Sequence, residues 1–254
     1  MTKTIVMIHG AFAGGWCFEN FAGVFASRGW TCHAPDLRFH GDGAVAPPDP
    51  RLAQTSISDY TRDMAEFISG LGERPIVIGH SMGGLIAQML AAQGHVAAMV
   101  LLASGAPWGV LPSTDDELAI ATGLMSAGPF WKRALTPVFE VAVKDSLASI
   151  APAARRGVFD RFGPESGRAL FELFFWMFDK ERATQVDAQR VTCPVLVVNG
   201  SQDKVVSAAT GRQIARLYGE RATFHEAPGH GHFLLLEEGW QQLARHSADW
   251  IAER

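Results

Sequence analysis

The chain alternates between short apolar runs and longer segments in which apolar residues recur every three or four positions. Short runs of apolar and β-branched residues are typical of buried strands, whereas the longer period is typical of amphipathic helices. The pattern predicts strands at 4–9, 30–34, 75–79, 98–103, 194–199 and 222–226. It predicts helices at 17–28, 58–71, 82–93, 207–218 and from about 238 to 252.

Helix-end signals support this division of the chain. Gly29, Gly72 and Gly94 follow three of the predicted helices, and a glycine just past the last turn commonly ends a helix. Ser56 or Ser58 is the expected N-cap of the second helix. Strands that are apolar on both faces and separated by helices indicate a parallel sheet covered on both sides. The sequence therefore predicts an α/β fold with a doubly wound, mostly parallel sheet.

The alternation stops between residues 106 and 187. This stretch has a helical pattern without a convincing core strand, and it is interrupted by Pro107, Pro112, Pro129, Pro137, Pro152 and Pro164. Since it lies between one core strand and the next, we expect it above the carboxyl ends of the strands. The predicted domains are a core of residues 1–105 and 188–254 and a mainly helical cap of residues 106–187. Residues 38–55 are rich in Gly, Pro and Asp and are predicted to form a loop.

Aromatic residues gather near the end of the predicted cap, at Phe171, Phe174, Phe175, Trp176 and Phe178. Such a cluster can pack the cap onto the core, or some of its members can line an apolar pocket. Both possibilities stay open at this point. The residues selected as candidates for contact with a substrate are Phe12, Trp108, Phe175, Trp176 and Phe233.

Composition limits the classes of function. The 254 residues carry a net charge of −4, and no run of Lys and Arg exceeds two residues, which argues against a nucleic-acid or anionic-membrane surface. Apolar stretches fall short of the roughly 18–20 residues that a membrane span needs. We expect a cytoplasmic protein, a monomer or homodimer, acting on a small molecule. Cys17, Cys32 and Cys193 are expected to be free and buried, and no pattern predicts a metal or an organic cofactor.

The strongest chemical signal is the stretch Gly-His-Ser-Met-Gly-Gly at 79–84, which joins a predicted strand to a predicted helix. The pattern G-x-S-x-G in this setting predicts a nucleophile elbow. So tight a turn forces Ser81 into a strained backbone conformation, and side chains at Gly79 and Gly83 would collide. Ser81 is therefore the expected nucleophile, presented at the carboxyl edge of the sheet.

A serine hydroxyl needs a base, and the base needs a group that orients it. In this fold the acid and then the histidine follow the serine along the chain. Asp203 comes in the loop after the fifth predicted strand, where sites form in open α/β sheets. Asp179 and Asp187 follow no core strand, so Asp203 is the expected acid.

The base is sought among the late histidines. His225 lies inside a predicted strand and His246 inside the last helix, so His230 and His232, in the loop between them, remain as candidates.

The negative oxygen of a tetrahedral intermediate needs backbone N–H donors. One is expected from Met82, directly after the nucleophile. The second is expected from Ala11, because the small residues of the loop after the first strand let its backbone approach the site.

Over nearly its whole length the sequence resembles the α/β-hydrolase superfamily. His9-Gly10 is similar to its oxyanion-loop motif, residues 79–84 to its nucleophile elbow and residues 200–203 to its acid turn. In the family's histidine loop a Glu follows the His by five, and the spacing of His232 and Glu237 selects His232 over His230. Residues 9–16 also resemble the branch of methylesterases and hydroxynitrile lyases.

Departures from the family patterns exclude some chemistries. Hydroxynitrile lyases carry Thr after the first-strand His and Lys after the catalytic His, where this chain has Gly10 and Phe233. Dehalogenases and epoxide hydrolases of this fold carry Asp in place of Ser81, and Phe12 replaces the Pro of the His-Gly-x-Pro turn.

The resemblance implies a serine hydrolase of small to medium, partly apolar carboxylic esters or lactones, acting through an acyl-enzyme. The alternatives are a carbon–carbon bond hydrolase of β-diketone-like substrates with the same triad, and a non-catalytic receptor for small molecules on the same fold.

Overall fold

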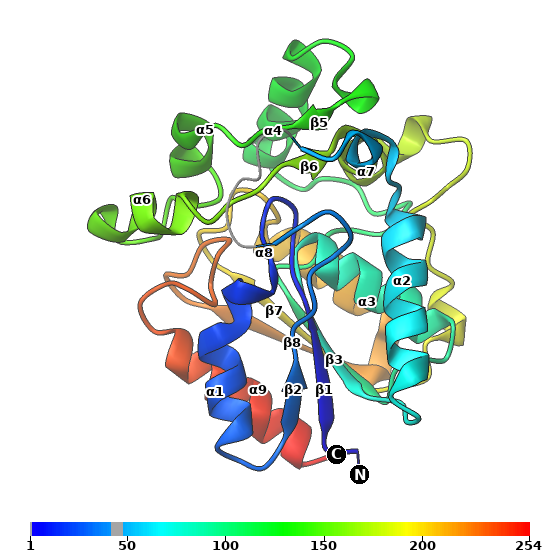
Figure 1. The fold of residues 1–254 in the computed structure, drawn as a ribbon. Coiled ribbons are helices and arrows are strands. Elements are labelled where there is room, and N and C mark those ends of the chain that lie inside the picture. Colours follow the sequence, from blue (N-terminus) through cyan, green and yellow to red (C-terminus); the bar gives the residue numbers. More distant parts are fainter. Residues whose placement is uncertain (1, 42–47) are drawn as a thin grey trace.

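A single parallel sheet organises the chain. The computed structural model describes residues 2–41 and 48–254 (Figure 1). Six strands follow the order β2-β1-β3-β4-β7-β8, and every neighbouring pair is parallel. Their bounds are β1 Thr4–Ile8, β2 Thr31–His33, β3 Ile76–His80, β4 Ala98–Leu102, β7 Val195–Gly200 and β8 Ala222–Ala227. The predicted fold class, a doubly wound and mostly parallel sheet, is confirmed.

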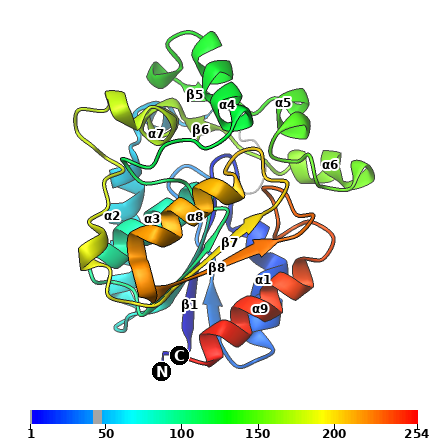
Figure 2. The ribbon, with the colours of Figure 1, turned by 180° about the vertical axis from the view of Figure 1, so that it is seen from behind.

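Helices cover both faces of this sheet (Figures 1 and 2). On one face lie α1 and α9, which contact each other, and on the other lie α2, α3 and α8. Side chains alternate between the two faces of the sheet along each strand. Ile5 and Met7 pack in the core on the side of α1 and α9, and Val6 and Ile8 pack in the core on the side of α2, α3 and α8. The bounds are α1 Glu19–Ala26, α2 Ile57–Gly70, α3 Met82–Ala92, α8 Ala208–Tyr218 and α9 Trp240–Ala252.

Besides shifts of one or two residues at the ends of elements, two segments differ from the sequence prediction. The helix expected at 17–28 is divided into a 3₁₀ helix at Gly15–Phe18 and α1, and the backbone N–H of Gly15 donates to Asp36 Oδ1 at 2.7 Å. The segment expected to be loop at 38–55 contains a 3₁₀ helix at Pro50–Gln54, while its residues 42–47 lie outside the described part. Ser56, and not Ser58, caps α2 in a reciprocal capping box with Asp59.

The cysteines follow the prediction in part. All three are free; Cys17 and Cys193 are buried, whereas Cys32 is only half-buried. Within residues 2–41 and 48–254, no helix is both long and apolar enough to cross a bilayer.

Residues 106–187 gather at the end of the sheet where the strands finish (Figures 1 and 2). Besides helices, the segment contains a short antiparallel pair of strands, β5 with β6, which the sequence pattern did not indicate. The elements are α4 Asp115–Ser126, β5 Ala134–Leu135, α5 Phe139–Lys144, α6 Pro152–Phe159, β6 Glu165–Ser166 and α7 Gly167–Phe174, with 3₁₀ helices at Phe130–Lys132 and Trp176–Phe178. A further 3₁₀ helix, Ala188–Arg190, follows the segment.

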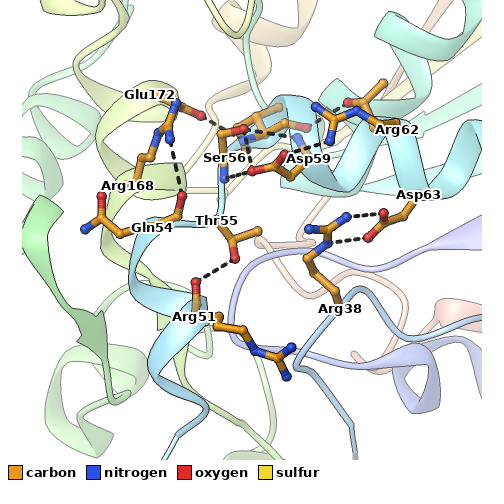
Figure 3. A network of polar contacts seen from close by, with 12 residues as sticks. Arg38, Arg51, Gln54, Thr55, Ser56, Asp59, Arg62, Asp63, Arg168 and Glu172 are labelled. Atoms are coloured by element: carbon orange, nitrogen blue, oxygen red, sulfur yellow. Dashed lines mark hydrogen bonds and ion pairs between the residues drawn. The ribbon is translucent and has the colours of Figure 1, made fainter.

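A polar network attaches this segment to the start of α2 (Figure 3). Glu172 on α7 accepts from the backbone N–H of Ile57 at 2.8 Å and from Arg168 at 2.9 Å. The Ser166 hydroxyl donates to the carbonyl of Thr55 at 2.6 Å. Glu172 thus satisfies a free N–H of the first turn of α2, where a negative charge is also favoured by the helix dipole.

A second carboxylate, that of Glu117, joins α4 to the first turn of α8. It accepts from the backbone N–H of Thr114 at 3.0 Å, which completes a capping box on α4. Its other oxygen accepts from the backbone N–H of Ser207, the N-cap of α8, at 2.7 Å. Because Glu117 is buried, water does not replace these contacts when they are lost.

Glu117→Gln is expected to lower the free energy of unfolding by about 1–3 kcal/mol, because one buried N–H loses a charged acceptor. Urea titration followed by circular dichroism measures the change. The matched control is Glu66→Gln on the exposed face of α2, expected within about 0.5 kcal/mol of the wild type. Equal losses in the two variants would contradict the assigned role of Glu117.

Candidate active site

The turn between β3 and α3 has the steric form that its glycines predict. Ser81 takes φ +51° and ψ −120°, a conformation that L-residues rarely adopt. A Cβ atom on Gly83 would lie 2.1 Å from the carbonyl oxygen of Ile8, and one on Gly79 would lie 2.3 Å from the carbonyl oxygen of Gly83. The two glycines therefore let α3 start directly against β1, and this close approach holds Ser81 at the carboxyl edge of the sheet.

Three of the predicted residues meet in one hydrogen-bonded chain. His232 Nδ1 lies 3.0 Å from Asp203 Oδ2, and His232 Nε2 lies 3.1 Å from Ser81 Oγ. A carboxylate only accepts, so Nδ1 carries the proton and Nε2 is left to accept from the serine hydroxyl. All three residues are buried, with between 4% and 8% of their surface exposed.

Asp203 uses both of its oxygens. While Oδ2 faces His232, Oδ1 accepts from the backbone N–H groups of Val205 at 2.8 Å and Val206 at 3.0 Å. The turn-capping contacts therefore fix the carboxylate in place. The two other aspartates considered from the sequence, Asp179 and Asp187, accept only from nearby backbone N–H groups in their own turns among the bonds of the described chain.

Among the bonds of the described chain, His230, the competing base, makes none to Ser81. Its Nδ1 lies 3.2 Å from Glu237 Oε2, and the same oxygen accepts from the backbone N–H of Gly231 at 2.8 Å. Glu237 thereby holds the loop that carries His232.

The loop after β1 lies directly against Ser81. A Cβ atom on Gly10 would approach Cβ of Ser81 to 2.8 Å, so only glycine allows this contact. Ala11, the next residue, lines the cavity beside Ser81. Met82 is the first residue of α3, and the N–H groups of a first turn have no acceptor within the helix. Ala11 thus lies at the same cavity as Ser81, and Met82 follows Ser81 directly in the chain.

Two buried histidines support these loops as neutral groups. His80 Nε2 donates to the carbonyl of His232 at 2.9 Å, and burial lowers the pKa of His80 to about 3. His9 Nδ1 donates to the carbonyl of Gly10 at 2.8 Å, and its Nε2 accepts from the N–H of Leu37 at 3.0 Å. Burial, with His40 nearby, lowers the pKa of His9 to about 4.

A cavity of about 840 Å³ opens above Ser81 and His232. Its wall is mainly apolar and comes largely from residues 119–146 and 162–174, while the exposed charged side chains of Arg133, Glu140 and Lys144 lie at its rim. A cavity of this size holds a drug-sized organic molecule.

The aromatic candidates separate into two groups. Phe12 and Phe233 line the cavity, together with Phe174. Trp108, Phe175 and Trp176 are not part of its wall within the described residues. Phe175 stacks on Phe171 and packs against Phe130, and Trp108 contacts Trp176, so these rings hold the segment together. The helical spacing of aromatic residues in the sequence could not predict which rings pack within residues 106–187 and which face the cavity.

Near the site lie two buried polar residues that the sequence analysis did not select, His40 and Glu165, whose side chains form an ion pair at 3.0 Å. No local pattern marks a glutamate as buried, since most glutamates are exposed. In the chain as described, no group of three or more His, Cys, Asp or Glu residues is arranged to hold a metal ion.

Gly83→Ala is expected to destabilise the protein by about 3 kcal/mol or more, because the new methyl group meets backbone that cannot move aside. Thermal and urea denaturation measure the loss. Gly23→Ala in α1 is the control: its added Cβ meets nothing within 4 Å, and a gain of about 0.5–1 kcal/mol is expected. A Gly83→Ala protein as stable as the wild type would refute the steric argument.

Stability is expected to fall as the pH decreases from about 6 to 5. In the unfolded chain His9 and His80 bind protons below their usual pKa of about 6.5, whereas the folded protein resists protonation down to about 4 and 3. The unfolded state then holds more protons, so each histidine contributes a loss of about 1.4 kcal/mol per pH unit. His80→Gln, which keeps a donor for the His232 carbonyl, should reduce the slope by about one proton. Urea titrations at several pH values measure the slope, and an unchanged slope would contradict the assignment.

Comparison with known proteins gives local similarity to ester-cleaving enzymes. The chain is 36% identical over 122 residues to a pyrethroid hydrolase of Sphingobium wenxiniae, covering 45% of this chain and 41% of that protein. It is 30% identical over 110 residues to methylesterase 7 of Arabidopsis thaliana, covering 41% of each. These matches thus span about two fifths of the length of the curated relatives. The similarity to methylesterases expected from residues 9–16 is confirmed.

Solved structures agree with the fold. A monoacylglycerol lipase of Paleococcus ferrophilus superposes with a TM-score of 0.72 at 21% identity, over 98% of this chain and 94% of the lipase. At that identity the likeness concerns the fold alone. A sequence model of the alpha/beta hydrolase family matches residues 5–246, and the chain therefore belongs to that family.

Proposed function

We propose that the protein hydrolyses carboxylic esters or lactones through an acyl-enzyme, with Ser81 as nucleophile, His232 as base and Asp203 as the group that orients the base. The observation that carries the proposal is the chain of hydrogen bonds from Asp203 through His232 to Ser81 at the base of a mainly apolar cavity. The ester-cleaving activities in the names of the relatives support the same reaction class.

In the acylation half, the Ser81 hydroxyl attacks the ester carbonyl while His232 Nε2 takes its proton. Asp203 holds the ring in the tautomer that leaves Nε2 free and stabilises the imidazolium that forms. The carbonyl oxygen becomes negative, and we assign its stabilisation to hydrogen bonds from the backbone N–H groups of Ala11 and Met82. His232 then protonates the departing alcohol, which leaves an acyl group on Ser81.

In the deacylation half, His232 removes a proton from water, which attacks the acyl carbonyl. Collapse of the second tetrahedral intermediate releases the carboxylic acid and returns the proton to Ser81. Every proton in this cycle passes through His232, and the side chains required are all present in the chain.

The cavity supports a preference for substrates with an apolar part. We propose that residues 106–187 act as a cap over the core of residues 1–105 and 188–254, and that Phe12 and Phe233 contact the substrate. The rings of Phe12, Phe174 and Phe233 together offer a wide apolar contact surface close to the Ser81 hydroxyl.

Treatment with a fluorophosphonate followed by peptide mass spectrometry is expected to place the label on Ser81. On p-nitrophenyl esters, Ser81→Ala and His232→Ala should each lower kcat by about 10³-fold or more, and Asp203→Asn by a comparable factor. His230→Ala is the matched control, since its ring does not face Ser81, and a change below about 10-fold is expected. Label on another residue, or a greater loss from His230→Ala than from His232→Ala, would overturn the assignment.

The same measurements distinguish ester hydrolysis from the two alternative functions, hydrolysis of a carbon–carbon bond and non-catalytic binding of a small molecule. Labelling of Ser81 without turnover across a panel of acyl esters, methyl esters and lactones would favour hydrolysis of a carbon–carbon bond next to a carbonyl. Tight ligand binding without labelling would favour a receptor.

A further inference from the structure

The residue after the expected oxyanion donor Ala11 has an unusual backbone. Phe12 adopts φ +63°, in the left-handed region that favours glycine and disfavours a residue with a bulky side chain. Such a conformation persists only where surrounding contacts hold it, and it is typical of functional loops. The contacts that hold Phe12 are therefore informative about how the oxyanion loop is fixed.

Both backbone polar groups of Phe12 are bound by one short piece of the cap. Its carbonyl accepts from the N–H of Gly163 at 2.8 Å, and its N–H donates to Glu165 Oε2 in a long hydrogen bond of 3.4 Å. Glu165 is the first residue of β6, so a cap strand and the oxyanion loop are linked at Phe12.

The Glu165 carboxylate is itself fixed from the core. The Tyr60 hydroxyl on α2 donates to its Oε1 at 2.7 Å, and His40 Nε2 donates to its Oε2 at 3.0 Å. His40 Nδ1 faces the carbonyl of Arg38 at 3.0 Å, so both ring nitrogens meet acceptors and both carry protons. The side chains of His40 and Glu165 are fully buried as an imidazolium–carboxylate pair.

The surrounding charges favour this pair. Burial alone would neutralise both groups, but the adjacent Glu165 carboxylate raises the pKa of His40, and His40 lowers that of Glu165. Among the described residues, the titratable groups that act on this cluster include Tyr60, Arg38, Asp36 and the ring of His9, which lies 5.2 Å from that of His40.

We propose that Glu165 is a positioning residue for the oxyanion hole: its buried carboxylate, together with the Gly163 N–H, holds Phe12 in the left-handed conformation and so fixes the loop that presents the Ala11 N–H. The inference rests on the proposed ester hydrolysis. It assigns to the cap a part in stabilising the transition state besides enclosing the substrate. An unfixed loop would still admit substrate but would donate poorly to the developing negative charge, so turnover would suffer more than binding.

The test is a double-mutant cycle between Glu165→Gln and Phe12→Gly. Glycine adopts positive φ without strain, so the loop of the Phe12→Gly protein no longer depends on Glu165. In the wild-type background, Glu165→Gln is expected to lower kcat on p-nitrophenyl esters by about 10-fold to 100-fold, with KM changed by less than about 3-fold. In the Phe12→Gly background, the same change should alter kcat by less than about 3-fold. In the Phe12→Gly background, both proteins that are compared lack the Phe12 ring, so the effect of losing this ring from the cavity cancels in the ratio of their kcat values.

Glu172→Gln is the matched control, because Glu172 is another buried glutamate of the cap bound to α2 and has no contact with Phe12 among the bonds of the described chain. It should leave kcat within about 3-fold in both backgrounds. If Glu165→Gln does not fold, Tyr60→Phe removes one donor to the same carboxylate. A loss of about 2-fold to 5-fold in kcat is then expected, again absent with Phe12→Gly.

Equal losses in the two backgrounds would reduce Glu165 to a general stabilising role and overturn the inference. A rise in KM with kcat unchanged would also overturn it. Failure of the proposed function is distinguishable, because the wild-type protein would then neither turn over esters nor be labelled at Ser81.

Discussion

The close contact between the elbow and the end of β1 is the constraint on which the rest of the site depends. Gly83 lies so near the carbonyl oxygen of Ile8 that no side chain fits between them. That contact ties the first turn of α3 to the same strand end from which the oxyanion loop departs. Ser81 and the loop after β1 are therefore placed by one packing arrangement, at the point where the strand order reverses between β1 and β3.

Carboxylates fix the remaining parts of the site from several directions. Glu237 binds the histidine loop, Glu117 binds the start of α8 behind the acid turn, and Glu165 binds the oxyanion loop. Each accepts from backbone N–H groups in a buried place, where a charged acceptor gives a stronger hydrogen bond than a neutral one. These contacts thus fix loops that hold the candidate site residues.

Local signals predicted the class of the fold and the order of its core strands along the chain. The six core strands and the steric need for glycine around Ser81 could be predicted because each depends on residues a few positions apart, whereas the structure was needed to choose Ser56 over Ser58 as the N-cap of α2. The positions of Trp108, Phe175 and Trp176 outside the cavity wall could not be predicted, because only long-range packing decides which rings of residues 106–187 meet the cavity. Glu165 was missed for the same reason: its partners His40 and Tyr60 are more than a hundred residues away in the sequence.

The attachment of β6 to the oxyanion loop affects how such a protein can diversify. An insertion between two strands of an α/β sheet can in principle be exchanged between relatives, because it joins the core only at its two ends. In this chain those ends adjoin the neighbouring strands β4 and β7. Here an exchanged cap would also need a carboxylate at the place of Glu165, matched to His40 and Tyr60 in the recipient core. Recombination between distant relatives would therefore succeed more often when the segments around residues 38–41 and 57–60 travel together with the cap.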